Sequence, residues 1–299
     1  MVETAERITR ALNGSWYGRY GVARCPAHGD DKPSLSLAHG ADGRLLLRCH
    51  AGCEFVSILD ALRALGILEG RGAVPKLDQE NITRRMMEER LAARKKACQA
   101  RQCWVESLPI NGTVAEAYLR EVRGISCMLP ETLRYHPSAW HGATGQRLPA
   151  LVARIDHAAN FAVHRTYLRA DGSGKALVQP EKAMLGPSSG GGVRLANGHE
   201  AVAVAEGIET GLSLLCGPLQ GSVAVWAALS ASGMKALLLP TRPGSLIIAT
   251  DSDDCGVGRQ AGLALADRAH ALGWAIRMLP APEGADWNDV IRDMKGPTK

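Results

Sequence analysis

Four residues near the start of the chain have the types and the spacing of a zinc site. A C-x2-H pair and a C-x3-C pair are formed by Cys25, His28, Cys49 and Cys53. Thiolate and imidazole are the ligands that zinc prefers, and four of them complete a tetrahedral structural site. His50 is a competing candidate, which we rank lower because adjacent side chains rarely reach one metal without strain. The pattern predicts a structural zinc site.

Five carboxylates in three short motifs form a second set, nearer the end of the chain. Glu206 opens an E-G-x-E motif, Asp251 and Asp253 form a D-x-D motif, and Asp286 and Asp289 enclose a Trp-Asn pair. Carboxylates that lie close together need divalent cations to neutralise one another, and hard oxygen ligands select magnesium or manganese. Such ions can clamp the attacking and leaving oxygens in phosphoryl or nucleotidyl transfer. The motifs therefore predict a magnesium or manganese site with that chemistry.

The segments around these carboxylates predict a sheet that brings two of the motifs together. Buried strands are expected over 201–205, 222–226, 246–250 and 274–279, with helices between them. Strands that alternate with helices form a parallel sheet covered on both faces, and ligands bind beyond the carboxyl ends of its strands. Glu206 and Asp251 each follow such a strand directly. The competing interpretation, that 251–254 only caps the helix expected over 258–272, is less favoured for Asp251 and Asp253.

The zinc ligands and the segment after them predict a small module followed by a long helix. Short strands are expected over 34–37 and 44–48, so that the two ligand pairs stand at hairpin ends, as in a zinc ribbon. A helix is expected over 56–66. Residues 78–104 contain neither Pro nor Gly and are rich in charged residues, which predicts a long exposed helix with a solvated basic face.

A basic hairpin is expected between the long helix and the acidic motifs. Its strands are predicted over 150–155 and 161–168. Arg154 and Arg165 are expected to project from it, and Lys182 follows it in the sequence. We interpret these three residues as contacts for nucleic acid or nucleotide phosphates.

Composition limits the classes of protein that fit. The net charge is +5, and the excess lies in residues 76–101, with eight Lys/Arg against four Asp/Glu, whereas residues 201–299 hold eight against ten. A polyanion could bind the basic region. No apolar run is long enough to span a membrane, so no membrane partner is expected. Five of the eight cysteines lie outside the zinc pattern in scattered contexts, which favours a cytoplasmic protein with reduced thiols.

These motifs together resemble a known group of enzymes. Residues 25–53 resemble the zinc-binding domain of bacterial, phage and plasmid primases, and residues 206–289 resemble the Toprim domain shared by primases, topoisomerases and related nucleases. The resemblance implies catalytic roles for Glu206, Asp251 and Asp253, further metal binding by Asp286 and Asp289, and template or nucleotide binding by Arg154, Arg165 and Lys182. The C-x3-C spacing and the histidine after Cys49 are similar to the mobile-element branch, which implies a phage, plasmid or integrative-element origin.

The expected fold is α/β, or α+β for the chain as a whole, in four parts. They are a zinc ribbon over 1–70, a basic helical linker over 71–105, a mixed α+β subdomain over 106–195, and a Toprim-like domain with a parallel sheet over 196–299. The resemblance implies a DNA primase that makes short RNA primers on single-stranded DNA from nucleoside triphosphates, with structural zinc and catalytic magnesium or manganese. The chain has no helicase-type nucleotide loop, so a replicative helicase acting with it would be a separate chain.

Three alternatives remain open at this stage. A Toprim nuclease would use the same carboxylates with water as the nucleophile, and the zinc module favours the primase over it. A topoisomerase needs a nucleophilic tyrosine in a large gated domain, for which the chain has no room. A DNA-binding accessory protein with a decayed site is disfavoured because all three acidic motifs are present.

Overall fold

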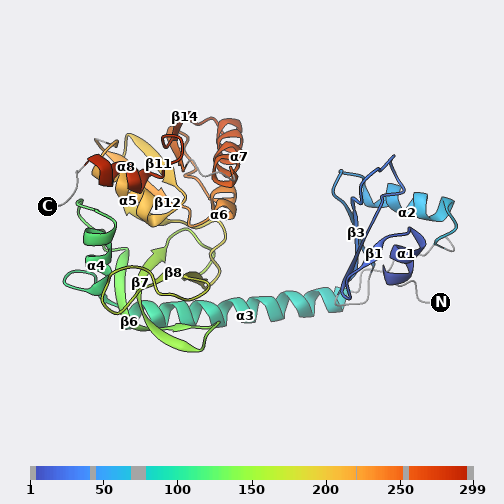
Figure 1. Ribbon diagram of the computed structural model, residues 1–299, viewed down its shortest axis with the longest axis horizontal. Coiled ribbons are helices and arrows are strands. Elements are labelled where there is room, and N and C mark those ends of the chain that lie inside the picture. The colour runs from blue at the N-terminus through green and yellow to red at the C-terminus, as the bar shows by residue number, and fades with distance from the viewer. Residues whose placement is uncertain (1–4, 41–44, 69–78, 220, 252–255, 295–299) are drawn as a thin grey trace. The chain divides into compact units, whose positions relative to one another are not determined.

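The computed structural model describes residues 5–40, 45–68, 79–219, 221–251 and 256–294. The chain divides into two compact units, residues 1–82 and 83–299 (Figure 1). Asp253, one of the predicted catalytic residues, lies outside the described residues. No helix in the described ranges has the length and apolar character needed to cross a membrane.

The first unit is a small antiparallel sheet with two helices. Its elements are α1 (Ala5–Ala11), β1 (Ser15–Trp16), β2 (Tyr20–Ala23), β3 (Leu35–His39), β4 (Leu45–Cys49) and α2 (Phe55–Ala64), and the strands are ordered β1-β2-β3-β4. Side chains of a strand alternate between its faces, so Leu35 and Leu37 of β3 both enter the core, where they meet Ile8 of α1 and Leu62 of α2. The two strands and the helix predicted in this region correspond to β3, β4 and α2.

The second unit begins within a long helix and continues with a five-stranded antiparallel sheet. The elements are α3 (Gln79–Glu106), β5 (Leu108–Pro109), α4 (Val114–Ala117), a π-helix η1 (Tyr118–Val122), β6 (Leu133–His141), β7 (Gln146–Ile155), β8 (Ala162–Tyr167) and β9 (Lys182–Leu185). The strands are ordered β5-β6-β7-β8-β9. Strand β6 is absent from the sequence prediction because Pro137 interrupts its pattern. The register shifts between His136 and Ala139, and proline is tolerated at such an irregularity.

A five-stranded, mainly parallel sheet follows. Its elements are β10 (Val193–Ala196), β11 (Ala201–Ala205), α5 (Ile208–Cys216), β12 (Val223–Ala227), α6 (Ala231–Ala236), β13 (Ser245–Thr250), α7 (Val257–Ala271), β14 (Ala275–Pro280) and α8 (Trp287–Met294). The order is β10-β12-β11-β13-β14. The four predicted strands are confirmed as the parallel set β12-β11-β13-β14, and β10 adds an antiparallel edge that the sequence did not predict.

Helices cover both faces of the parallel sheet, as the buried strands require (Figure 1). Val204 and Leu246 face α6 and α7, where they pack against Met234 and Leu265. On the opposite face, Ala203 belongs to a core that includes residues of α5 and α8 and extends to Leu151 and Ile155 of β7. The predicted subdomains 106–195 and 196–299 therefore share one continuous core. This packing places β9 and η1 close to the ends of the parallel strands.

Candidate functional site

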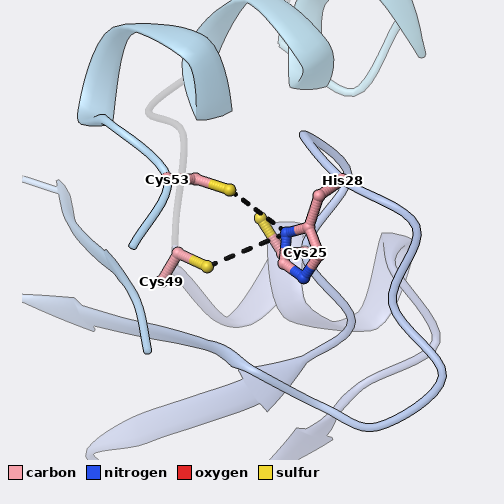
Figure 2. Close-up of side chains that lie close together, drawn as sticks. All are labelled: Cys25, His28, Cys49 and Cys53. Atoms are coloured by element: carbon pink, nitrogen blue, oxygen red, sulfur yellow. Dashed lines mark hydrogen bonds between the residues drawn. The ribbon is translucent and has the colours of Figure 1, made fainter. Parts of the chain in front are cut away.

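The first candidate site is the Cys/His cluster of the first unit (Figure 2). The ligand atoms of Cys25, His28, Cys49 and Cys53 all lie within 4.8 Å of one another. His28 Nδ1 is 3.1 Å from Cys53 Sγ and 3.9 Å from Cys49 Sγ. Ligand atoms around a tetrahedral zinc with bonds of about 2.3 Å are roughly 3.8 Å apart, so these side chains fit the metal with little rearrangement.

A carboxylate lies behind the histidine of the cluster. Asp30 Oδ1 lies 3.7 Å from His28 Nε2, the ring nitrogen that faces away from the sulfurs. Asp30 Oδ2 accepts hydrogen bonds from Ser34 Oγ at 2.6 Å and from the backbone N–H of Cys25 at 2.8 Å, and these bonds hold the pKa of Asp30 below its usual value. Asp30 is therefore near enough to accept the free N–H of His28 after a small adjustment, and such a carboxylate fixes the tautomer of a metal-binding histidine. The sequence analysis did not identify Asp30.

Two further contacts define the ligand set. His50 is exposed, and its Nε2 lies 2.8 Å from Ser36 Oγ. The histidine of the cluster is therefore His28 and not His50. Burial raises the pKa of Cys49, but the N–H groups of Cys53 and Ala51 and the Ser34 hydroxyl outweigh it and lower the pKa to about 6. Because metals bind the thiolate form, the Cys49 sulfur is ready to bind a cation at neutral pH.

The acidic motifs define the second candidate site, at the carboxyl ends of β11 and β13. Glu206 follows β11, and Asp251 follows β13. Thr210 Oγ1, in the first turn of α5, donates to Asp251 Oδ2 at 3.3 Å, and the backbone N–H of Trp287, at the start of α8, lies 3.5 Å from Asp251 Oδ1. Asp251 therefore joins the segments of all three acidic motifs.

A glycine in α7 makes room for the other strand-end carboxylate. A Cβ atom built on Gly258 would lie 3.2 Å from Glu206 Oε2, closer than most side-chain contacts. The first turn of α7 thus approaches the Glu206 carboxylate directly. A helix N-terminus carries a partial positive charge, which favours an anion at this position.

These side chains line a pocket of ≈ 310 Å³ that contains both acidic and basic groups. Its lining residues are Arg123, Lys175, Lys182, Glu206, Gly207, Glu209, Thr210, Leu229, Ser230, Asp251, Asp286 and Asn288. Carboxylates suit divalent cations, and lysine and arginine suit phosphates. The pocket can therefore hold a metal ion and a phosphate group together.

Glu209 is the most deeply buried charge of the pocket. Lys182 Nζ lies 3.2 Å from Glu209 Oε2, and the Tyr118 hydroxyl donates to Glu209 Oε1 at 3.1 Å. Arg123 Nε donates to the Tyr118 hydroxyl at 2.9 Å. A buried carboxylate persists only when paired and hydrogen-bonded, and here the partners come from η1, from β9 and from the residue after η1.

The electrostatics of this cluster keep Glu209 ionised. Burial raises the pKa of Glu209, but the ammonium of Lys182, the N–H of Glu209 itself and the charges of Lys175 and Arg123 together lower it to about 2. His164 of β8 is buried beside these cations. Burial is the main reason that its pKa falls to about 4, and Lys182 lowers it further, so the imidazole is neutral at pH 7.

Of the two aspartates in the third acidic motif, only Asp286 lines the pocket. Asp286 lines the pocket and accepts the backbone N–H of Asp289 at 2.7 Å, so it also caps the start of α8. The Asp289 side chain is about half exposed, lies 4.0 Å from Arg292 Nη1 and does not line this pocket. Asn288 is buried, and its Nδ2 donates to the backbone oxygen of Arg123 at 2.7 Å and to Ser213 Oγ at 3.0 Å.

The two predicted basic residues of the hairpin lie on the face that packs against α3. Val152 pairs with Arg165, and Arg154 pairs with Val163, so both arginines share the face on which Val152 and Val163 pack against Ala100 of α3. Arg165 is buried, and its Nη1 donates to the Trp140 backbone oxygen at 2.8 Å. The prediction that Arg165 projects from the hairpin is therefore wrong. It failed because α3 covers this face.

Arg154 and Lys182 differ from Arg165 in their accessibility. The Arg154 side chain is 41% exposed and pairs with Asp156 at 3.0 Å. Lys182 pairs with Thr166 across β8 and β9, which puts it on the opposite face of the sheet, toward the pocket. Of the three basic residues, the structure places only Lys182 with the carboxylates.

Sequence reasoning missed several pocket residues. Glu209 is the second glutamate of the E-G-x-E motif, but the sequence assigned it no role in the site, although it lies one helical turn from Glu206. Lys175 precedes Lys182 by seven positions and ends a G-S-G-K sequence, which is typical of a turn. Arg123 and Tyr118 carry no sequence signal, because only the packing of η1 against α5 brings them to Glu209.

Two segments of the chain match known protein families. Residues 94–195 match the model of DUF7146, a domain of unknown function, and residues 201–297 match the Toprim domain. Two solved structures are weakly similar. One, of the DnaG catalytic core, has 14% identity and a TM-score of 0.38, covering 67% of this chain and 74% of that one. The other, of the DnaG primase catalytic domain bound to ssDNA, has 15% identity and a TM-score of 0.40, covering 68% and 78%.

No match is found among curated proteins. The Toprim match spans the parallel sheet from β11 onward and all three acidic motifs. The prediction of this domain from Glu206, Asp251 and Asp286 is confirmed. Residues 201–297 of the chain are a Toprim domain.

Proposed function

We propose that the protein is a DNA primase that joins ribonucleotides on a single-stranded DNA template by metal-dependent nucleotidyl transfer. The observation that supports this most is the composition of one pocket. One pocket of ≈ 310 Å³ is lined both by carboxylates of the Toprim segment and by three cations of the preceding 94–195 segment. These cations are Arg123, Lys175 and Lys182. A nucleoside triphosphate presents both a metal-binding group and several negative charges, and this pocket complements both.

The carboxylates are proposed to bind the catalytic metal. Glu206, Asp251 and Asp286 offer hard oxygen ligands, which fit magnesium or manganese, and Asp253 and Asp289 are proposed to assist. Such ions stabilise the charge on the attacking and leaving oxygens of a nucleotidyl transfer. Glu206 either completes the metal site or accepts the proton of the attacking 3′-hydroxyl.

The basic residues are proposed to hold the phosphates. Lys182 is fixed by Glu209, and Arg123 by the Tyr118 hydroxyl, so both heads are positioned before a ligand arrives. Prepositioned charges cost little reorganisation during a reaction. Arg154, which is partly exposed, is proposed to contact the template backbone.

The tyrosine beside the Toprim site does not suit a topoisomerase. Tyr118 is fully buried and its hydroxyl donates a hydrogen bond to Glu209, and burial together with that negative charge raises the pKa of Tyr118. A tyrosine that attacks DNA has to reach a phosphate and lose its proton, and Tyr118 is prepared for neither step.

The first unit is proposed to bind a structural zinc through Cys25, His28, Cys49 and Cys53 and to help hold the template. The donor set and the Asp30 carboxylate behind His28 support this assignment. The spacing of the second ligand pair supports an origin in a phage, plasmid or integrative element.

The test is an assay of the purified full-length protein with single-stranded DNA, labelled ribonucleotides and magnesium or manganese. The proposal expects short labelled RNA products that need template, all four nucleotides and the metal. Shortening of the DNA without nucleotides would instead identify a Toprim nuclease. DNA binding without any product under either metal would identify an accessory protein.

A further inference from the structure

Two cysteines outside the zinc cluster lie side by side in the second unit. Cys127 follows η1 in the 94–195 segment, and Cys216 is the last residue of α5 in the Toprim domain. They are 89 residues apart in sequence, and each is partly exposed. The proposed primase chemistry uses neither of them.

The contacts of the pair make the two sulfurs unequal. Cys216 Sγ accepts the backbone N–H of Ser126 at 3.3 Å and that of Cys127 at 3.4 Å. The Cys127 thiol is also hydrogen-bonded to the Cys216 side chain, which raises the pKa of Cys127 and lowers that of Cys216. The two backbone N–H groups that point at Cys216 Sγ stabilise a negative charge there, and the thiolate is the reactive form of cysteine.

The backbone around Cys127 is held in place. Arg120 Nη1 donates to the backbone oxygens of Ile125 and Cys127, at 2.8 and 2.6 Å. The Cys127 sulfur also lies 3.7 Å from the backbone oxygen of Leu212, one turn before Cys216. The bonds of Arg120 hold the backbone at Cys127 without involving either thiol, and this keeps the two sulfurs adjacent.

We propose that Cys127 and Cys216 form a reversible oxidation site that reacts with a low-molecular-weight disulfide such as oxidised glutathione. The Cys216 thiolate attacks one sulfur of the reagent, the reagent's S–S bond breaks, and one reagent thiolate leaves. The Cys127 thiol then attacks the Cys216 sulfur of this mixed disulfide, passes its proton to solvent base and releases the second reagent thiolate. The protein loses two electrons to the reagent, which becomes two thiols.

A Cys127–Cys216 disulfide would link residues 94–195 covalently to the Toprim segment, residues 201–297. Arg123 precedes Cys127 by four residues, and Glu209 stands in the first turn of the helix that ends at Cys216. A bond between Cys127 and Cys216 would therefore connect the two chain segments that supply these pocket residues.

The experiment treats the zinc-loaded full-length protein with oxidised glutathione, blocks the remaining thiols with iodoacetamide and maps the peptides without reduction. In the wild type, Cys127 and Cys216 should lose alkylation to the same extent, with recovery of a linked 127–216 peptide that disappears on reduction. Cys127→Ser should instead retain glutathione on Cys216. Cys216→Ser should leave Cys127 alkylated. Cys98→Ser, which removes an exposed thiol of α3, is the matched control and should form the link as the wild type does.

The proposal is overturned if Cys127 and Cys216 stay fully alkylated in the wild type, or if glutathione adds to Cys127 in Cys216→Ser as readily as to Cys216 in Cys127→Ser. The wild-type map needs no variant, so a folding defect in either serine variant leaves the first criterion intact. Circular dichroism of each variant before treatment identifies such a defect, and Cys216→Ala then replaces Cys216→Ser.

Discussion

Lys182 Nζ lies 3.2 Å from Glu209 Oε2 and connects β9 of the antiparallel sheet to α5 of the Toprim domain. The Glu209 side chain is 9% exposed and the Lys182 side chain 34%, so the lysine reaches from the pocket to a buried carboxylate. A charge buried this deeply is costly without its partner. The pair therefore ties the basic part of the pocket to its acidic part.

Glu209→Gln should lower the free energy of unfolding at pH 7 by about 3 kcal/mol, because Lys182 loses the buried counter-charge with which it pairs. The folded pKa of Glu209 lies near 2, below its ordinary 4.5, so this stabilisation is complete above about pH 4.5 and lost as the pH falls toward 2. Urea denaturation measures the effect. Glu181→Gln, which removes the half-exposed partner of Lys175, is the control and should cost less than about 1 kcal/mol. Equal effects of the two changes would refute the importance of burial at Glu209.

His164 should make the protein sensitive to mild acid. Its pKa is about 4 when folded and 6.5 ordinarily, so the unfolded chain binds a proton first as the pH falls. The stability is complete above pH 6.5 and should decrease by about 1.4 kcal/mol per pH unit toward pH 4. His164→Gln should show a shallower slope over this window, whatever its stability at pH 7. Denaturation curves at several pH values measure both slopes, and identical slopes would show that His164 titrates normally in the fold.

Zinc content should depend on Cys49 and not on its neighbour. Cys49→Ser should lose bound zinc and unfold the first unit, because metal binding and folding of a small module are coupled. His50→Ala should keep zinc near the wild-type level, because His50 bonds to Ser36 instead. Metal analysis of the purified variants gives the answer. A wild-type protein without zinc, or a loss of zinc in His50→Ala, would contradict the ligand set.

Arg154 and Arg165 should respond differently to substitution. Arg154→Ala should weaken binding of single-stranded DNA and reduce its salt dependence by about one unit of slope, as expected for one lost phosphate contact. Arg165→Ala should act on stability, by about 1–3 kcal/mol, because it removes a buried bond to Trp140. Fluorescence anisotropy at several salt concentrations and denaturation distinguish the two effects. Unchanged binding by Arg154→Ala would remove it from the proposed template contacts.

Site residues could be predicted where their position depends on neighbouring residues in the sequence, and not where it depends on the packing of distant elements. Glu206 and Asp251 could be placed because each directly follows a buried strand, and strand ends of a parallel sheet meet at one edge. The orientation of the Arg165 side chain could not be predicted from the sequence, because it depends on which face of the hairpin α3 covers. The contact between Tyr118 and Glu209 joins residues 91 positions apart, and only the folded core brings them together.

The central claim is that the strand-end carboxylates perform nucleotidyl transfer, and Asp251→Asn tests it most directly. The change keeps the side-chain shape, an oxygen that can accept from the Trp287 N–H and an amide that can donate to the Thr210 hydroxyl, so the thermal midpoint should stay at or above the wild-type value. Primer synthesis on the same preparation should fall by about two orders of magnitude or more. Asp267→Asn, on the exposed face of α7, should leave synthesis unchanged. A stable Asp251→Asn protein that makes primers at the wild-type rate would contradict the account.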